Sequence, residues 1–255
     1  MKFTGHTILL TGGSSGIGLA FAAKFLELGN EVIITGRNAA KLDAAKAQFL
    51  GLHTIVGDVA DSSGVVALAD QVKVRFPKLD VLMNNAGILV NRNLSVPVAD
   101  LGALTAEFAT NVNGTIQMTS ALIDVLTANN GTIINVSSGL AFVPLTSAPI
   151  YSATKAAIHS YTTSLRFQLE GRGVRVVELM PPAVKTDMTV GFSEGGAKLI
   201  TTDELVAATI PALEAGDDEI RPGQSNQLHW MARFAPAFIN RALFTNSKGL
   251  IPAVD

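Results

Sequence analysis

Tyr151 and Lys155 lie four residues apart in the segment Tyr-Ser-Ala-Thr-Lys, and Ser138 precedes them in the chain. On a helix, residues at this spacing share one face, with Cβ atoms roughly 5–6 Å apart. A free tyrosine has a pKa of about 10, and a neighbouring cation lowers that pKa because it favours the phenolate. The pair predicts a tyrosine general acid/base, with the Ser138 hydroxyl orienting the group that is protonated. The spacing alone is common by chance, so the rest of the chain must decide.

The bulk composition sets the limits for this chemistry. The chain has 255 residues, which fits one large α/β domain, and its high apolar and low charged content indicates a globular protein. A net charge of -2 offers no basic surface for nucleic acid. The absence of cysteine excludes thiolate catalysis, and the four scattered histidines lack the spacing of a metal site. With no signal peptide and no apolar run of about 20 residues, we expect a cytoplasmic protein without membrane contact.

A glycine-rich turn near the N-terminus indicates a nucleotide site. The apolar run 7–10 is followed by Thr-Gly-Gly-Ser-Ser-Gly-Ile-Gly at 11–18, and apolar residues then recur at helical spacing over 19–28. Glycines in a strand-to-helix turn let the backbone approach a pyrophosphate, and the helix N-terminus supplies free N–H groups. An ordinary glycine-rich turn is the alternative interpretation.

Arg37 predicts a preference between the two nicotinamide dinucleotides. A second strand over 31–35 ends at Gly36, where an acidic residue would hydrogen-bond the ribose 2′-hydroxyl of NAD. No carboxylate is present to repel a 2′-phosphate, and the Arg37 guanidinium can pair with one. NADP is therefore favoured, with NAD possible, and Ser14 adds a weaker expected contact.

Strand and helix patterns alternate along the chain, with further strands over 54–57, 80–83, 132–136, 174–179 and 219–221. This order predicts a single doubly wound, Rossmann-type α/β domain of about seven parallel strands with helices on both faces. Ligands of such sheets bind at the carboxyl ends of the strands. The glycine-rich turn, Arg37, Asp58, residues 85–87 and Ser138 all fall at those ends, so we expect them to converge on one edge.

Four later segments have expected roles. Residues 98–126 are mostly helical, and Asn111-Val112-Asn113-Gly114 interrupts the second part, either as a surface kink or as a break that turns an amide toward the site. The helix over 150–170 carries a stripe of small residues that suits either packing on the sheet or contact with a second subunit. We expect one domain over 1–255, in which 188–200 is a substrate loop and 224–255 a C-terminal helical extension.

The combined motifs resemble the short-chain dehydrogenase/reductase family over nearly the whole chain. The resemblance is carried by the residues at 11–18, Asp58-Val59, Asn-Asn-Ala-Gly at 84–87, Asn-Val-Asn-Gly at 111–114, Ser137-Ser138, the Tyr-Lys segment, and Pro-Pro-Ala-Val-Lys-Thr at 181–186. The segments Ile-Ile-Asn-Val-Ser-Ser-Gly-Leu-Ala-Phe-Val-Pro and Glu-Ile-Arg-Pro-Gly-Gln are similar to the DltE-type oxidoreductase subgroup. The chain departs from the family at Pro182, where a glycine is usual, and this stiffens the turn.

The resemblance implies a set of site residues. The implied catalytic tetrad is Asn111, Ser138, Tyr151 and Lys155, in which Lys155 also contacts the nicotinamide ribose and Asn111 holds a water that links Lys155 to solvent. The expected cofactor-binding residues are Gly12, Ser14, Ser15, Gly16, Ile17, Gly18, Arg37, Asp58, Val59, Asn85, Ala86, Gly87, Tyr151, Lys155, Pro181, Val184 and Thr186. In this set, Asp58 lies near the adenine, and Val184 and Thr186 hold the nicotinamide carboxamide.

The expected activity is hydride transfer between NADP(H) and a small carbonyl or secondary alcohol, in a homodimer or homotetramer. Met188, Phe192 and Phe142 indicate an apolar substrate pocket, which His229 and Trp230 could approach from the tail. One alternative is a catalytically silent NADP-binding sensor of the same fold, since a fold never establishes activity. A sugar-nucleotide epimerase or dehydratase is a further alternative, which the short chain and the glycine spacing weaken.

Overall fold

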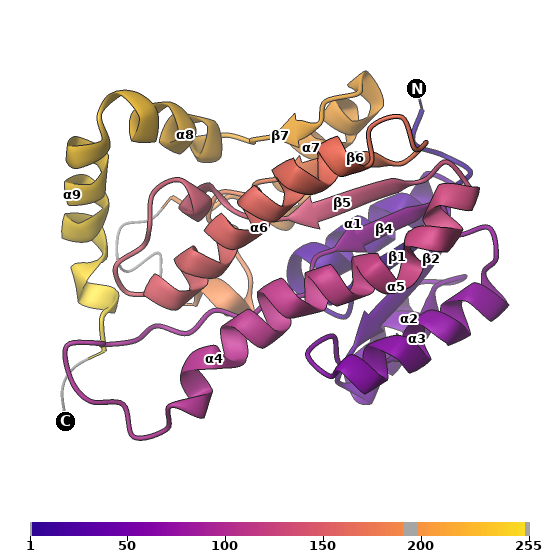
Figure 1. The fold of residues 1–255 in the computed structure, drawn as a ribbon, viewed down its shortest axis with the longest axis horizontal. Coiled ribbons are helices and arrows are strands. Elements are labelled where there is room, and N and C mark those ends of the chain that lie inside the picture. Colours follow the sequence, from indigo (N-terminus) through magenta and orange to yellow (C-terminus); the bar gives the residue numbers. More distant parts are fainter. Residues whose placement is uncertain (1, 191–197, 253–255) are drawn as a thin grey trace.

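The computed structural model describes residues 2–190 and 198–252, which form a central parallel β-sheet covered by helices on both faces (Figure 1). The strands are β1 (Thr7–Thr11), β2 (Glu31–Gly36), β3 (His53–Val56), β4 (Val81–Asn84), β5 (Thr132–Val136), β6 (Arg175–Leu179) and β7 (Glu219–Ile220). Their order in the sheet is β3-β2-β1-β4-β5-β6-β7, and every neighbouring pair is parallel. The predicted doubly wound α/β fold with seven parallel strands is confirmed.

Helices cover the sheet in two layers. One layer holds α1 (Gly16–Glu27), α2 (Ala39–Gln48) and α7 (Thr202–Ala215), and the other holds α3 (Ser62–Arg75), α5 (Gly114–Ala128) and α6 (Pro149–Gln168). The strands are buried on both sides, so two apolar cores form, one under each layer. Strand order reverses between β1 and β4, and the crevice at this point lies at the carboxyl ends of the strands.

Side-chain caps explain where several helices begin. The Asn38 side chain accepts a hydrogen bond from the Lys41 N–H at the start of α2, and Asp61 caps α3 through the Ser63 N–H. At α7, Thr201 and Glu204 form a reciprocal capping box. These signals are local in sequence, which is why α7 begins and ends where its pattern predicts.

The interruption predicted at Asn111–Gly114 is a π-helical turn over Ala109–Asn113, and it joins α4 (Gly102–Phe108) to α5. The helical run begins at Gly102 rather than at 98, and the Asp100 side chain, just before the N-cap Leu101, accepts a hydrogen bond from the Ala103 N–H in the first turn. At Gly114, a Cβ atom would lie 2.7 Å from the Val59 side chain. The glycine is therefore required by close contact with the loop after β3.

The C-terminal residues form α8 (Gln224–Phe234) and α9 (Pro236–Ser247), and a 3-10 turn (Lys248–Leu250) follows. Both helices lie beyond the carboxyl ends of the strands, on the same side as the N-terminus of α6 (Figure 1). Within the described ranges, no helix has both the length and the apolarity that crossing a membrane would require. Because of this placement, α8 and α9 lie next to the edge of the sheet where the sequence predicts the site.

Candidate active site

The turn from β1 to α1 lies against the residues that follow β4. Gly12 has a φ of +67°, and a Cβ atom there would lie 2.8 Å from the Ala86 Cα. The Asn85 amide fixes this contact, because its Nδ2 donates to the carbonyls of Thr11 and Gly12 at 3.0 and 3.1 Å. The Thr11 hydroxyl accepts from the Asn85 and Ala86 N–H groups. Sequence motifs more than seventy residues apart thus form one surface.

The N-terminus of α1 has the features of a phosphate site. Its N-cap residue, Ser15, makes no side-chain capping hydrogen bond, and the first turn holds no acidic residue. Ser15, Gly16, Ile17 and Gly18 all line the main cavity. Uncapped helix N–H groups and the positive end of the helix dipole stabilise an anion at this position. The residues present therefore fit the pyrophosphate of a dinucleotide.

Cations gather where the adenosine half of a dinucleotide would lie. Arg37 follows β2, is largely exposed, and its Nη1 lies 3.8 Å from a carboxylate oxygen of Asp58. Lys41, on the first turn of α2, also lines the cavity and was not predicted from the sequence. Its charge and its place four residues after Arg37 were the available signal. The Ser14 side chain packs beside Gly36, where a Cβ atom would lie 3.2 Å from the Ser14 hydroxyl.

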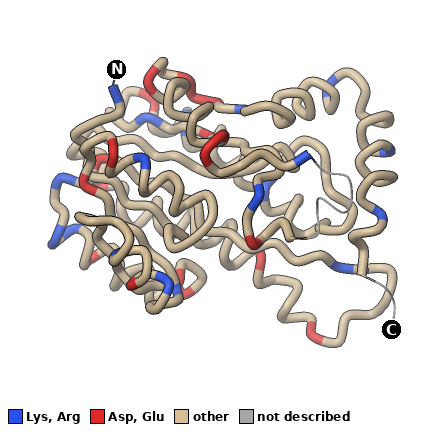
Figure 2. Tube along the Cα trace, turned by 180° about the vertical axis from the view of Figure 1, so that it is seen from behind, with Lys and Arg blue, Asp and Glu red and all other residues tan. Residues whose placement is uncertain are grey.

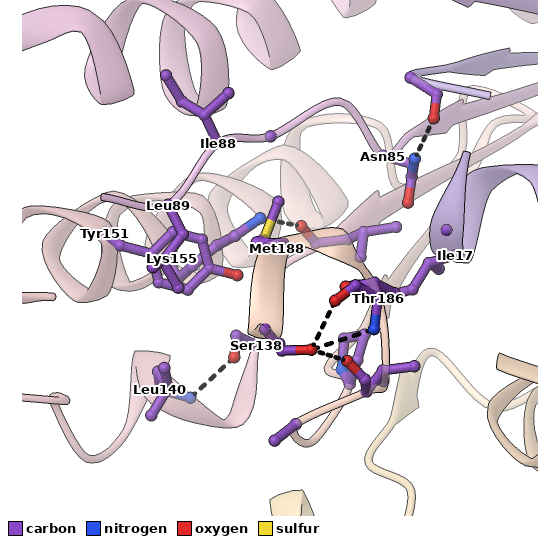
Figure 3. A pocket seen from close by; sticks show the side chains of 18 of the residues that line it. Ile17, Asn85, Ile88, Leu89, Ser138, Leu140, Tyr151, Lys155, Thr186 and Met188 are labelled. Carbon is purple, nitrogen blue, oxygen red and sulfur yellow. Dashed lines mark hydrogen bonds between the residues drawn. The ribbon is translucent and has the colours of Figure 1, made fainter. Parts of the chain in front are cut away.

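Helix α6 places Tyr151 and Lys155 in the cavity wall (Figure 3). The Lys155 Nζ lies 5.5 Å from the centre of the Tyr151 ring and donates a 2.8 Å hydrogen bond to the Val136 carbonyl at the end of β5. Ser138 follows two residues later and caps the next turn through the Leu140 N–H. The pair on α6 and the serine after β5 therefore meet at the carboxyl edge of the sheet.

Burial changes the pKa of both members of the pair. Desolvation lowers the pKa of Lys155 to about 8, and the nearby Glu178 carboxylate opposes this decrease. Burial raises the pKa of Tyr151 above its ordinary value of 10, although a hydrogen bond with the Ser138 side chain opposes the increase. Desolvation of the phenol is the largest cause of this shift, and the expectation that Lys155 lowers the Tyr151 pKa stays a prediction. Tyr151 is therefore neutral at physiological pH and can act as an acid.

Asn111 lies behind the cavity wall and is almost completely buried. Its Oδ1 accepts from the Ile88 N–H at 2.8 Å, and its Nδ2 donates to the Ile88 carbonyl at 2.9 Å and to the Thr154 hydroxyl at 3.0 Å. The Asn111 carbonyl accepts a hydrogen bond from the Thr115 hydroxyl. The π-helical turn thus directs this amide toward the site, where it ties the chain after β4 to α6 between Tyr151 and Lys155.

A buried acidic residue on β6 supports the segment that carries Ser138. Glu178 has no exposed surface, and one of its oxygens accepts a hydrogen bond from the Ser137 hydroxyl. Its other oxygen lies 2.9 Å from the His159 Nδ1. His159, for which we expected a packing role, also contacts the ring of Phe142. Phe142 and His229 pack on each other with ring centres 4.7 Å apart. Sequence reasoning missed Glu178, although a carboxylate inside an apolar strand is a visible signal.

One cavity, with a volume of about 720 Å³, extends from the glycine-rich turn and Arg37 to Tyr151 and Lys155. It is lined by Ser138 and by all seventeen residues expected to bind the cofactor, Gly12, Ser14, Ser15, Gly16, Ile17, Gly18, Arg37, Asp58, Val59, Asn85, Ala86, Gly87, Tyr151, Lys155, Pro181, Val184 and Thr186. These roles stay predictions, because a lining position is not a contact with a ligand.

The segment after β6 returns to the sheet edge. Val184 pairs with Ile200 in an isolated bridge, and the Pro181 carbonyl accepts from the Gly139 N–H. These contacts hold the Pro181-Pro182 turn against the loop that carries Ser138. Met188 lines the cavity, as expected, whereas Phe192 and most of the expected substrate loop lie outside the described residues.

A comparison with known protein families shows to which family this chain belongs. A family model described as short chain dehydrogenase matches residues 6–196. The chain belongs to the short-chain dehydrogenase family. This match covers every strand from β1 to β6 together with the Tyr151–Lys155 pair.

Relatives of this short-chain dehydrogenase include oxidoreductases of several kinds. An uncharacterised oxidoreductase DltE of Bacillus subtilis (strain 168) is 40% identical over 227 residues, which cover 86% of this chain and 89% of the relative. A serine 3-dehydrogenase of Rhizobium radiobacter is 32% identical over 247 residues, which cover 96% and 93%. A short chain dehydrogenase from Burkholderia cenocepacia J2315, solved in complex with NADP, has a TM-score of 0.83 at 28% identity and covers 95% and 99%. The predicted resemblance to the family and to DltE-type oxidoreductases is confirmed.

The His159–Glu178 pair in this short-chain dehydrogenase predicts a pH-dependent stability. The hydrogen bond to Glu178 raises the pKa of His159 above 6.5. Its stabilisation is therefore complete below pH 6.5, the unfolded value, and is lost as pH rises through the folded pKa. We expect His159→Ala to lower the free energy of unfolding by roughly 3 kcal/mol at pH 6, because Glu178 is left buried without its cation.

Urea unfolding at pH 6 and pH 8 measures this effect. The difference between wild type and His159→Ala should shrink at the higher pH. His53→Ala is the matched control, since its partner, Glu31, is at the surface and 3.5 Å away. A difference that is the same at both pH values would show that the ion pair contributes nothing beyond packing.

Proposed function

We propose that this short-chain dehydrogenase is an NADP(H)-dependent oxidoreductase that interconverts a carbonyl and a secondary alcohol, with Tyr151 as the general acid/base. The observation that carries the proposal is a single cavity that joins the uncapped N-terminus of α1 to a buried Tyr–Lys pair and Ser138. A dinucleotide sensor needs the first of these features but has no use for the second.

The residues divide the reaction between them in the reductive direction. A bound nicotinamide supplies the hydride for the carbonyl carbon. Tyr151, kept neutral by burial, donates its proton to the carbonyl oxygen. The Ser138 hydroxyl hydrogen-bonds the same oxygen and stabilises the charge that develops on it. The Lys155 ammonium stabilises the phenolate that remains until solvent returns a proton.

Asn111 has a positioning role in this proposal. Its amide holds the Ile88 backbone and the Thr154 side chain, and Thr154 lies on α6 next to Lys155. A Cβ atom on Gly87 would lie 3.4 Å from the Asn111 Oδ1 and 3.8 Å from the Lys155 Nζ. Asn111 thereby keeps the backbone after β4 at a fixed distance from the lysine.

Two observations support NADP over NAD. Arg37 and Lys41 both line the end of the cavity next to Asp58, and Gly36 leaves the ribose position without a carboxylate. A guanidinium and an ammonium together favour a 2′-phosphate.

The outer face of α6 supports a homodimer or homotetramer. Ala153, Ala156, Ser160 and Ser164 are exposed along this face, and Phe167 continues the stripe with 70% of its surface exposed. The buried face of the same helix carries Tyr151 and Lys155. Light scattering of wild type and of Ser160→Arg tests the proposal: a smaller particle for the variant supports it, and a monomeric wild type refutes it.

The activity is tested with a panel of aldehydes, ketones and secondary alcohols, each assayed with NADPH or NADH and with NADP⁺ or NAD⁺. We expect oxidation of NADPH with at least one carbonyl, and a kcat/KM for NADPH above that for NADH. Binding of NADPH without turnover of any compound would favour the sensor. A clear preference for NADH would contradict the role of Arg37 and Lys41.

A further inference from the structure

The end of the cavity next to Tyr151 is built from apolar side chains. Tyr151 belongs to a buried cluster with Leu145 and Ala148, and five partly buried leucines pack against this cluster. They are Leu89, Leu140, Leu199, Leu243 and Leu250. Four of the five, all except Leu199, also line the cavity, so the surface that surrounds the proposed acid is largely hydrocarbon (Figure 3).

The C-terminal helices close this end with more apolar groups. Leu228 and Met231 reach the cavity from α8, and Ile239 and Leu243 reach it from α9. The lining residues of the same helices that carry amides, Gln224, Gln227 and Asn246, are exposed, whereas the polar lining residue Ser247 is buried and its hydroxyl donates a hydrogen bond to the Leu243 carbonyl. The apolar groups therefore form the interior of this end, and amides form its rim.

This end offers little charge to a substrate. Apart from Tyr151 and Lys155, the ionisable side chains found among its described lining residues are Asp187 and Lys198, and both are exposed. Residues 224–252 hold three Lys or Arg residues and no acidic one (Figure 2). The three, Arg233, Arg241 and Lys248, are all absent from the lining. A carboxylate or sulfonate placed here would lose its hydration, and the cations among the described lining residues of this end are Lys155, which the proposed reaction uses, and the exposed Lys198.

From this lining we infer that the substrate is an uncharged carbonyl compound with an aliphatic chain, which extends from Tyr151 between Leu140, Leu228 and Leu243. The inference rests on the proposed carbonyl reduction and adds its substrate class. It also separates this chain from the serine 3-dehydrogenase relative, because serine carries two charges at neutral pH.

A chain-length series of aldehydes with NADPH tests the inference on the purified full-length protein. Each buried methylene contributes about 0.8 kcal/mol, which is about a fourfold change. We expect kcat/KM to rise by about fourfold per methylene from butanal until the cavity is filled. Succinic semialdehyde has the same four-carbon chain as butanal, with a carboxylate in place of the terminal methyl group, and we expect at least a tenfold lower kcat/KM for it.

Variants on α9 and α8 test where the aliphatic chain of the substrate lies in the cavity. Leu243→Gln and, on the other helix, Leu228→Gln should each lower kcat/KM for octanal by about tenfold and for butanal by less than threefold. Phe238→Gln is the matched control, because Phe238 is also on α9 but is exposed and does not line the cavity. An equal loss for both aldehydes in both lining variants would overturn the inference.

A binding measurement tests the inferred substrate class independently of the proposed catalytic activity. Octanamide and butyramide are uncharged carbonyl compounds that resist reduction, so calorimetry with the NADP⁺-loaded protein measures the pocket alone. Tighter binding of octanamide supports the inference even if no aldehyde, ketone or alcohol of the panel is turned over, an outcome that would refute the proposed function. Faster turnover of succinic semialdehyde or serine than of butanal or octanal would refute the inference and leave the function standing.

Discussion

Replacing Tyr151 with phenylalanine should lower kcat/KM for carbonyl reduction by about 10²–10⁴-fold, the usual contribution of a positioned acid. The variant removes one hydroxyl that is hydrogen-bonded to Ser138, so the free energy of unfolding should change by about 1 kcal/mol. The affinity for NADPH should stay within about threefold, because the proposed phosphate site is the N-terminus of α1.

The chain supplies its own control for this experiment. Tyr161 is the second of its two tyrosines, lies on the same helix and is hydrogen-bonded to Thr119. Tyr161→Phe therefore also removes one tyrosine hydroxyl, but from a residue that does not line the cavity, and it should leave kcat/KM within about twofold. Steady-state kinetics of both variants measure the comparison. If Tyr151→Phe kept normal turnover, or if Tyr161→Phe lost as much, the assignment of Tyr151 would be wrong.

Replacing Arg37 with alanine should lower kcat/KM for NADPH by about tenfold and leave that for NADH nearly unchanged. A hydrogen bond to a charged group contributes about 1.5–3 kcal/mol, and the lower value applies because the Arg37 side chain is 61% exposed. A double variant with Lys41→Ala should lose more, since both cations line this end of the cavity. The loss should also shrink as salt is added.

Lys46→Ala controls for the loss of charge alone. Lys46 is exposed in the last turn of α2, at the opposite end of that helix from Arg37, and it does not line the cavity. The ratio of kcat/KM for NADPH to that for NADH should fall in Arg37→Ala and hold in Lys46→Ala. A ratio that falls equally in both variants would mean that long-range charge, and no contact at Arg37, sets the preference.

Much of this fold was readable because its determinants are local. The apolar runs of β1, β4 and β5 and the capping box of α7 each lie within a short stretch of sequence. Alternation of strands and helices then limits the topology to very few arrangements. For the same reason, the convergence of the glycine-rich turn and Ser138 on one edge could be predicted before the structure was known.

Other features depend on burial and on distant contacts, which sequence spacing does not report. The raised pKa of Tyr151 follows from burial, and the cluster that contains Tyr151 includes packing by Leu243, more than ninety residues later in the chain. Glu178 could not be matched with Ser137 and His159 without the register of β5 and β6. Phe142 was expected in the substrate pocket, but it packs on His159 and His229 instead.

Transfer of a deuterium label from NADPH to a carbonyl carbon is the most direct test of the central proposal. The measurement uses NADPH deuterated on either face of nicotinamide C4 and the aldehyde or ketone with the highest kcat/KM in the panel. We predict that one of the two labelled cofactors places deuterium on the carbinol carbon of the alcohol, and that Tyr151→Phe slows this transfer. An alcohol without deuterium from either cofactor, or a label that appears only in water, would contradict the proposed reaction.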